Sequence, residues 1–139
     1  MTFEEIGRKL PNGFHDSKIR RITVDFVDGS ILLGMEVHAG SPGDPEPEQY
    51  RPGTLKVVSQ CLFFVEPPDP RYKFISRRSP LNVDGDSVKA GQSTEVDRLL
   101  PTLPHNTSIY RFFLEERNSF LYLAGGDVMF SWDDGGVLT

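Results

Sequence analysis

The segment His15-Asp16-Ser17 contains the three side-chain types of a hydrolase triad. In a triad the base must lie between the acid and the nucleophile in space. Consecutive residues that enter a strand point to alternate sides, so their adjacency argues against a triad. Ser17 also lacks the Gly-x-Ser-x-Gly turn that exposes a serine nucleophile. The pattern favours a structural junction, in which Asp16 forms an Asx turn and His15 bonds a backbone group.

The same segment supports a second interpretation, a polar ligand-binding or hydrolytic site. This site would centre on His15 and Asp16 and would include Arg20 and Glu36 from the strands that follow. It requires a concave cavity in which polar groups converge. We assign no catalytic residue.

Metal-ligating residues are sparse. The three histidines are His15, His38 and His105, and the acidic segment Asp84-Gly85-Asp86 lacks the spacing of a calcium-binding loop. Because Cys61 is the single cysteine, the chain cannot form an internal disulfide. Its position among apolar residues of a strand predicts a buried, inert thiol. The sequence therefore predicts no metal and no other cofactor.

The charge balance argues against a nucleic-acid-binding protein. The 139 residues include 15 basic and 20 acidic side chains, which gives a net charge of −5, whereas nucleic-acid binding requires a basic face. No apolar run approaches the roughly 18 residues of a membrane span. The acidic N-terminal segment is unlike a signal peptide. We therefore expect a cytoplasmic protein without a membrane association.

An acidic loop is the other candidate functional feature. Residues 39–53 contain four prolines, three glycines and three acids, so they cannot form a regular element. A surface loop of this length is either a tolerated insertion or a functional segment. The residues that it would present to a partner are Asp44, Glu46, Glu48, Tyr50 and Arg51.

The elements that must position these residues are mostly strands. Thr2 and Glu5 have the spacing of a capping box, which predicts a short helix over residues 2–10. Asp28-Gly29 predicts a two-residue hairpin turn within residues 18–38. Its register would place Phe26 opposite Ile31, Val24 opposite Leu33 and Ile22 opposite Met35 on one apolar face. On the other face Arg21 would lie opposite Glu36, and His38 would lie opposite Ile19.

The remaining pattern is also typical of an antiparallel sheet. We expect a strand over residues 54–66, with a bulge or a change from an exposed to a covered position. We also expect a short strand at 72–75 within a charged edge segment 71–78, followed by a turn region at 82–91 and a helix over 94–100. The C-terminal part predicts a meander of strands 108–116, 120–124 and 127–132, with turns at 117–119 and Gly125-Gly126. The six or seven strands predict one mainly β domain over residues 1–139. We expect an antiparallel two-sheet sandwich or a partly open barrel with one or two short helices.

Two segments carry a resemblance to known proteins. They are Gly13-Phe14-His15-Asp16-Ser17 with the strand that follows it, and Tyr50-Arg51-Pro52 with residues 63–70. The chain resembles small bacterial β-rich proteins with a Phe-His-Asp-(Ser/Ala) segment before the first strand, some of which are similar to immunity proteins of toxin systems. The resemblance implies a small β-rich fold and supplies no catalytic residues.

Two functions follow as hypotheses. The favoured one is a small non-enzymatic protein-interaction domain, immunity-like, whose acidic and loop-rich surface attracts a basic protein partner. The alternative is a β-sandwich that binds or hydrolyses a small ligand near His15 and Asp16. Under either hypothesis, unpaired sheet edges would allow a homo-oligomer.

Overall fold

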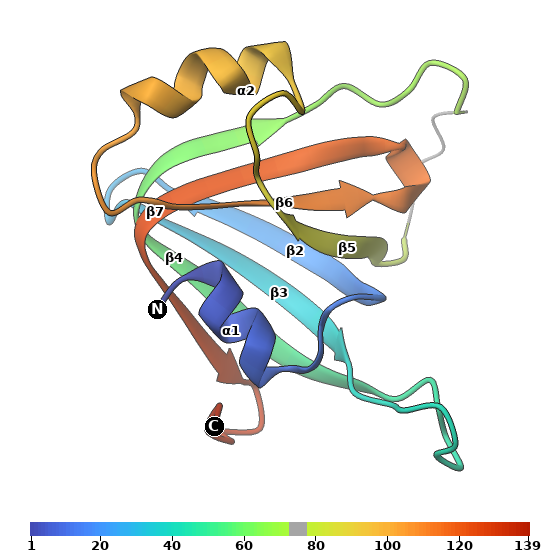
Figure 1. The fold of residues 1–139 in the computed structure, drawn as a ribbon. Coiled ribbons are helices and arrows are strands. Elements are labelled where there is room, and N and C mark those ends of the chain that lie inside the picture. Colours follow the sequence, from blue (N-terminus) through green and yellow to red (C-terminus); the bar gives the residue numbers. More distant parts are fainter. Residues whose placement is uncertain (73–77) are drawn as a thin grey trace.

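The computed structural model describes residues 1–72 and 78–139, and for Cys61 only the backbone. The helices are α1 (Phe3–Lys9) and α2 (Thr94–Leu99), with short 3-10 turns η1 (Leu100–Thr102) and η2 (Glu115–Arg117). The strands are β1 (Pro11–Phe14), β2 (Ser17–Asp25), β3 (Ser30–His38), β4 (Tyr50–Val65), β5 (Leu81–Ser87), β6 (Ser108–Leu114) and β7 (Ser119–Trp132) (Figure 1).

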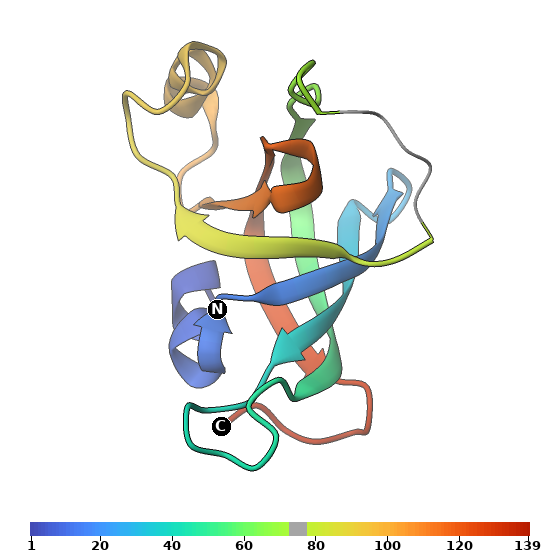
Figure 2. The same cartoon turned by 90° about the vertical axis from the view of Figure 1, so that its right-hand side faces the viewer.

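Six strands form a ring in the order β2-β3-β4-β7-β6-β5, and every neighbouring pair is antiparallel. The two views show this sheet wrapping around its own interior (Figures 1 and 2). The β2–β5 junction is short, because it joins only Ser17, Lys18 and Ile19 to Val83, Asn82 and Leu81. The prediction of a mainly β, antiparallel fold with short helices is therefore confirmed. One sheet forms a closed ring, which is nearer to the predicted barrel than to the two-sheet sandwich, although the prediction left the barrel partly open.

Helix α1 packs its apolar side on β1, β6 and β7. Phe3, Ile6 and Leu10 are buried, as their helical spacing predicts. The ring of Phe3 stacks on Tyr110, with 5.2 Å between the centroids, and burial raises the pKa of Tyr110 to about 12. The predicted capping box is confirmed: Thr2 N donates to Glu5 Oε2 and Glu5 N donates to Thr2 Oγ1.

The β2–β3 hairpin is present, but the predicted register is wrong by two residues. Val24 lies opposite Ile31 and Ile22 lies opposite Leu33. The turn is longer than two residues because Asp25 Oδ1 accepts hydrogen bonds from the backbone amides of Val27 (2.9 Å) and Asp28 (3.1 Å). A shift of two keeps the same face inward. The exception is Phe26, which is 83% exposed at the tip instead of packing on Ile31.

A β-bulge in β2 lies between Ile19 and Arg21. In a regular strand Ile19 and Ile22, three positions apart, would face opposite sides of the sheet. Because the bulge adds one residue between them, both face the core, and Val24 also packs against it. Two predicted neighbours are therefore wrong: Glu36 lies opposite Lys18 rather than Arg21, and His38 pairs with Tyr50 of β4 rather than with Ile19.

Strand β4 starts four residues earlier than predicted, so the loop covers residues 39–49. Tyr50 and Arg51 belong to the strand and pair with His38 and Val37. Of the two alternatives predicted for this strand, the bulge is present, as a register shift between Gln60 and Leu62. The strand ends before the prolines at 67 and 68, which lack the amide hydrogen that a ladder needs.

The C-terminal half differs from the prediction at two places. The expected turn region at 82–91 contains strand β5, which closes the ring. The expected turn at Gly125-Gly126 is the middle of one continuous strand, β7, which pairs with β6 and then with β4. A Cβ on Gly125 would lie 2.4 Å from Val57 Cγ1, so this glycine permits a close strand approach rather than a turn.

Helix α2 is confirmed, with Ser93 as its N-cap and Val96 buried. Among the described residues, neither helix has the length and apolar character needed to cross a membrane. The predicted short strand at 72–75 and most of the charged segment 71–78 lie outside the described residues, as does the predicted burial of the Cys61 side chain.

Candidate functional site

A cavity of about 500 Å³ lies beside the turn that joins β1 and β2. Five parts of the chain contribute to it: that turn, the end of β3, the loop 39–49, the start of β4, and the β5–η2 side of the ring. The lining residues are Asp16, His38, Ser41, Pro42, Pro47, Glu48, Tyr50, Asn82 and Glu115. We call this the acidic cavity, because three of its side chains are carboxylates.

The β1–β2 turn directs two polar side chains outward. Phe14 and Ser17 on either side of it are buried. The Ser17 hydroxyl donates to the His15 carbonyl oxygen (3.4 Å) and accepts a hydrogen bond from the His38 amide (3.3 Å). Asp16 adopts a left-handed backbone with φ of 52°. His15 and Asp16 are therefore exposed at the surface, while the Ser17 hydroxyl forms its hydrogen bonds with backbone groups.

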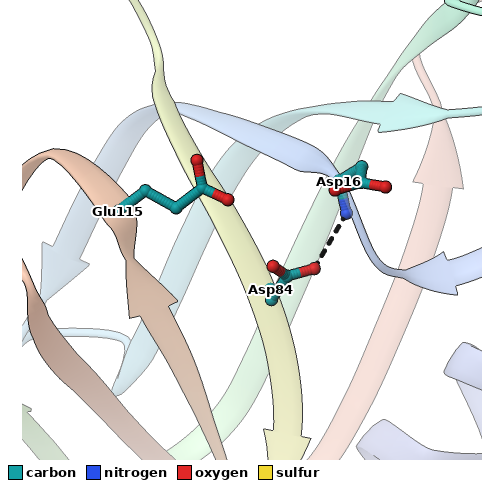
Figure 3. Close-up of side chains that lie close together, drawn as sticks. All are labelled: Asp16, Asp84 and Glu115. Carbon is teal, nitrogen blue, oxygen red and sulfur yellow. Dashed lines mark hydrogen bonds between the residues drawn. The ribbon is translucent and has the colours of Figure 1, made fainter.

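Asp84 on β5 holds this turn in place. Its Oδ1 accepts a hydrogen bond from the Asp16 backbone amide at 3.0 Å, and His15 Nδ1 lies 3.3 Å from the same oxygen. Figure 3 shows the Asp16–Asp84 contact beside Glu115. The polar partner of His15 is thus a carboxylate rather than the backbone group that the sequence suggested.

Three carboxylates converge here. Each of Asp16, Asp84 and Glu115 offers an oxygen, and these oxygens lie within 4.8 Å of one another. Partial desolvation raises the pKa of Glu115, although its side chain is largely exposed, and the charges of Asp84, Glu116 and Asp16 raise it further. Such oxygens could serve as ligands for a hard cation such as Ca²⁺ or Mg²⁺. The sequence predicted no metal site, because these residues come from three separate elements.

The loop 39–49 is fixed against the barrel rather than extended into solvent. Asn12 Nδ2 donates to the carbonyl oxygen of Gly40 at 2.8 Å, and His38 Nε2 lies 2.9 Å from the carbonyl oxygen of Pro47. A Cβ on Gly40 would lie 1.9 Å from that same Pro47 oxygen. Gly40 is therefore required for the loop to fold back, and this closure forms one wall of the acidic cavity.

The ring of Tyr50 provides an aromatic wall. The ammonium of Lys18 lies 4.4 Å from the centroid of this ring, and the His38 ring lies 5.5 Å from it. Cations are attracted to the face of an aromatic ring. The cavity thus combines carboxylates with a ring that already holds one cation of the protein itself.

The predicted interaction residues separate into different environments. Asp44 Oδ2 accepts a hydrogen bond from the Ser41 amide, so this carboxylate stabilises the loop. Glu46 is exposed on the loop, whereas Glu48 and Tyr50 line the cavity. Arg51 instead binds Asp134 with distances of 2.9 and 2.8 Å.

The predicted ligand site is also divided. His15 and Asp16 lie together beside the cavity, but Arg20 Nη2 binds Asp133 at 3.3 Å, and both line a different groove. Glu36 lies opposite Lys18 and Pro52 and does not line either hollow. Sequence reasoning missed Asn82 and Glu115, and it considered Asp84 only as part of an acidic segment without the spacing of a calcium-binding loop.

Comparisons with known proteins identify no family. The chain matches no protein-family model, and no curated protein is similar to it in sequence. One solved structure, an uncharacterized protein from Neisseria gonorrhoeae, shares 11% sequence identity with a TM-score of 0.44. The match covers 84% of this chain and 91% of that protein.

Proposed function

We propose that this protein is a non-enzymatic interaction module that binds a basic segment of a protein partner at the acidic cavity. The observation that carries this proposal is the convergence of Asp16, Glu48 and Glu115 on one hollow of about 500 Å³. They come from a turn, a loop and a 3-10 turn, and Asp84 adds a fourth carboxylate close to two of them. Complementary charge mainly accelerates and orients the encounter with a basic partner.

Tyr50 adds an aromatic wall to the carboxylates. The ammonium of Lys18 already covers one face of this ring, 4.4 Å from the centroid. A partner lysine or arginine would therefore bind mainly through the carboxylates.

The placement of Ser17 favours binding over catalysis. The hydroxyl is buried and bonded to two backbone groups, so it does not form a nucleophile with His15 and Asp16. The immunity-like role implied by the resemblance fits a binding module. That role, the bacterial source and the cytoplasmic location stay predictions.

A fluorescein-labelled octalysine peptide provides the test. Fluorescence anisotropy would give the dissociation constant for the wild type and for the double variant D16N/E48Q. Since each exposed ion pair contributes up to about 1 kcal/mol, we expect the double variant to bind roughly tenfold more weakly at low salt. We also expect binding to weaken when the salt concentration rises.

Asp28→Asn is the matched control. Asp28 is exposed at the tip of the β2–β3 hairpin, at the opposite end of β3 from His38. It removes one negative charge, as D16N or E48Q does alone, without changing the cavity. Its dissociation constant should therefore stay equal to that of the wild type, whereas each single cavity variant should bind more weakly. A loss in D28N equal to the loss in D16N or in E48Q would show unspecific attraction to an acidic protein and would contradict the proposal.

A small cationic ligand is the second candidate for the same cavity. Its volume lies within the range of about 300–1,000 Å³ that small-molecule sites occupy, and the three neighbouring carboxylate oxygens favour a cation. Thermal denaturation with Ca²⁺, Mg²⁺ or spermidine tests this candidate. A rise in melting temperature that Glu115→Gln abolishes, without octalysine binding, would favour it over a protein partner.

A further inference from the structure

A second hollow lies on the outer face of β2, β3 and β4 and shares no lining residue with the acidic cavity. Its volume is about 360 Å³. The lining residues are Arg20, Arg21, Thr23, Leu32, Gly34, Thr54 and Asp133. We call it the arginine groove.

The β2 bulge explains why two arginines lie together. In a regular strand, consecutive side chains point to opposite faces, so either Arg20 or Arg21 would enter the core. The bulge between Ile19 and Arg21 adds one residue, and both arginines are exposed while Ile19 and Ile22 pack inward. Bulges often change the direction of a side chain in this way beside functional sites.

Gly34 makes the groove concave. It lies opposite Arg21 on β2 and opposite Thr54 on β4. A Cβ on Gly34 would have ordinary contacts, 3.7 Å from Arg21 Cβ, so steric exclusion does not require glycine here. The missing side chain instead leaves space over the backbone between Arg21 and Thr54, which both line the groove.

One end of the groove already holds a carboxylate. Asp133 Oδ2 accepts a hydrogen bond from Arg20 Nη2 at 3.3 Å, and its Oδ1 accepts one from Thr54 Oγ1 at 3.0 Å. Arg21 has no hydrogen-bond or ion-pair partner among residues 1–72 and 78–139. The groove therefore shows a carboxylate bound to one arginine, while the second arginine has no polar partner in the described part of the chain.

We infer that the arginine groove is a second binding site, for an oxyanion, and that its ligand is a carboxylate of an acidic peptide segment. Arginine presents a planar set of donors that matches carboxylate and phosphate oxygens. The Asp133 contacts favour carboxylate as the ligand. The threonines and Leu32 add a neutral wall along which an extended peptide can lie. This site goes beyond the proposed function, because it takes the opposite charge.

A fluorescein-labelled octaglutamate peptide tests the inference in the intact protein. Because a hydrogen bond to a charged group contributes about 1.5–3 kcal/mol, we expect Arg21→Gln to weaken binding about tenfold or more. Arg98→Gln is the matched control, since Arg98 is exposed on α2 and does not line the groove. Its affinity should equal that of the wild type. Arg21 is exposed, so circular dichroism should show both variants folded.

Amide chemical shifts locate the ligand. Octaglutamate should shift the amides of Arg21, Gly34 and Thr54 in the wild type and leave them unchanged in R21Q. Inorganic phosphate serves as the competing oxyanion. The inference is overturned if octaglutamate does not bind, if R21Q binds as well as R98Q, or if these amides shift with phosphate and do not shift with octaglutamate. D16N/E48Q should bind octaglutamate at least as well as the wild type, which separates this site from the acidic cavity.

Discussion

The backbone amide of Asp16 donates a hydrogen bond to Asp84 Oδ1 at 3.0 Å, although 68 positions separate the two residues in the chain. This contact attaches the β1–β2 turn to β5, next to the short junction that closes the ring. It also places two carboxylates beside Glu115. This pair therefore lies both beside the junction that closes the ring and beside the acidic cavity.

Asp84→Ala should destabilise the fold. The variant leaves the Asp16 amide without its acceptor and removes the partner of His15. Since both groups are near solvent, we expect a loss of about 1 kcal/mol in the free energy of unfolding, measured with urea. Asp84→Asn keeps an oxygen acceptor and should lose less. Equal stability of D84A and the wild type would contradict this role.

Glu115 should give a small pH-dependent instability. Its pKa in the folded state is raised, first by burial and then by the neighbouring carboxylates, above the ordinary value of 4.5. The folded state therefore holds this proton more tightly, so stability falls as pH rises through and above 4.5. Below that range the group is protonated in both states, and the effect disappears.

Glu115→Gln should accordingly stabilise the protein at neutral pH and not at low pH. Because Glu115 is exposed, solvent screening limits the gain to about 0.5 kcal/mol or less. Urea titrations of wild type and variant at a series of pH values measure it. A gain that stays constant down to acidic pH would contradict the assigned cause.

The sequence predicts local elements well where one physical rule determines them. The Thr2–Glu5 capping box, the short helix α2 and the antiparallel hairpin all depend on residues close in the chain. The hairpin register was wrong because the Asp25 side chain bonds two turn amides, which competes with the two-residue turn that Asp28-Gly29 favours.

The candidate site could be predicted only in part, for a different reason. His15, Asp16 and Glu48 were identified from their polarity and their position in turns or loops. Glu115 was missed, and Asp84 was not placed beside Asp16, because ring closure brings β5 and η2 to the β1–β2 turn. No local pattern contains that information, and the glycine and aspartates of β5 have low strand propensity.

Gly125 provides a test of the continuous strand β7. A Cβ at this position would lie 2.4 Å from Val57 Cγ1 and 2.8 Å from the Val58 carbonyl oxygen. Gly125→Ala should therefore cost about 2 kcal/mol of stability through overpacking. Gly126→Ala is the adjacent control, since its Cβ would meet nothing closer than 3.4 Å. If the two glycines formed a turn instead, G125A would not be selectively destabilising.

The hairpin register predicts opposite results for two large apolar residues. Ile31 is fully buried and Phe26 is 83% exposed. Ile31→Ala should cost about 3 kcal/mol, whereas Phe26→Ser should change stability by less than about 0.5 kcal/mol. Thermal and urea denaturation measure both. A large loss of stability in F26S would contradict the observed register and favour the two-residue turn.

An amide chemical-shift titration with octalysine tests the central claim most directly. If the acidic cavity binds a basic segment, saturable shifts should concentrate on Asp16, Glu48, Tyr50, Asn82 and Glu115 and should disappear in D16N/E48Q. The amide of Asp28 at the far hairpin tip should not move. Shifts spread evenly over exposed acids, or an unchanged titration in the double variant, would contradict the account.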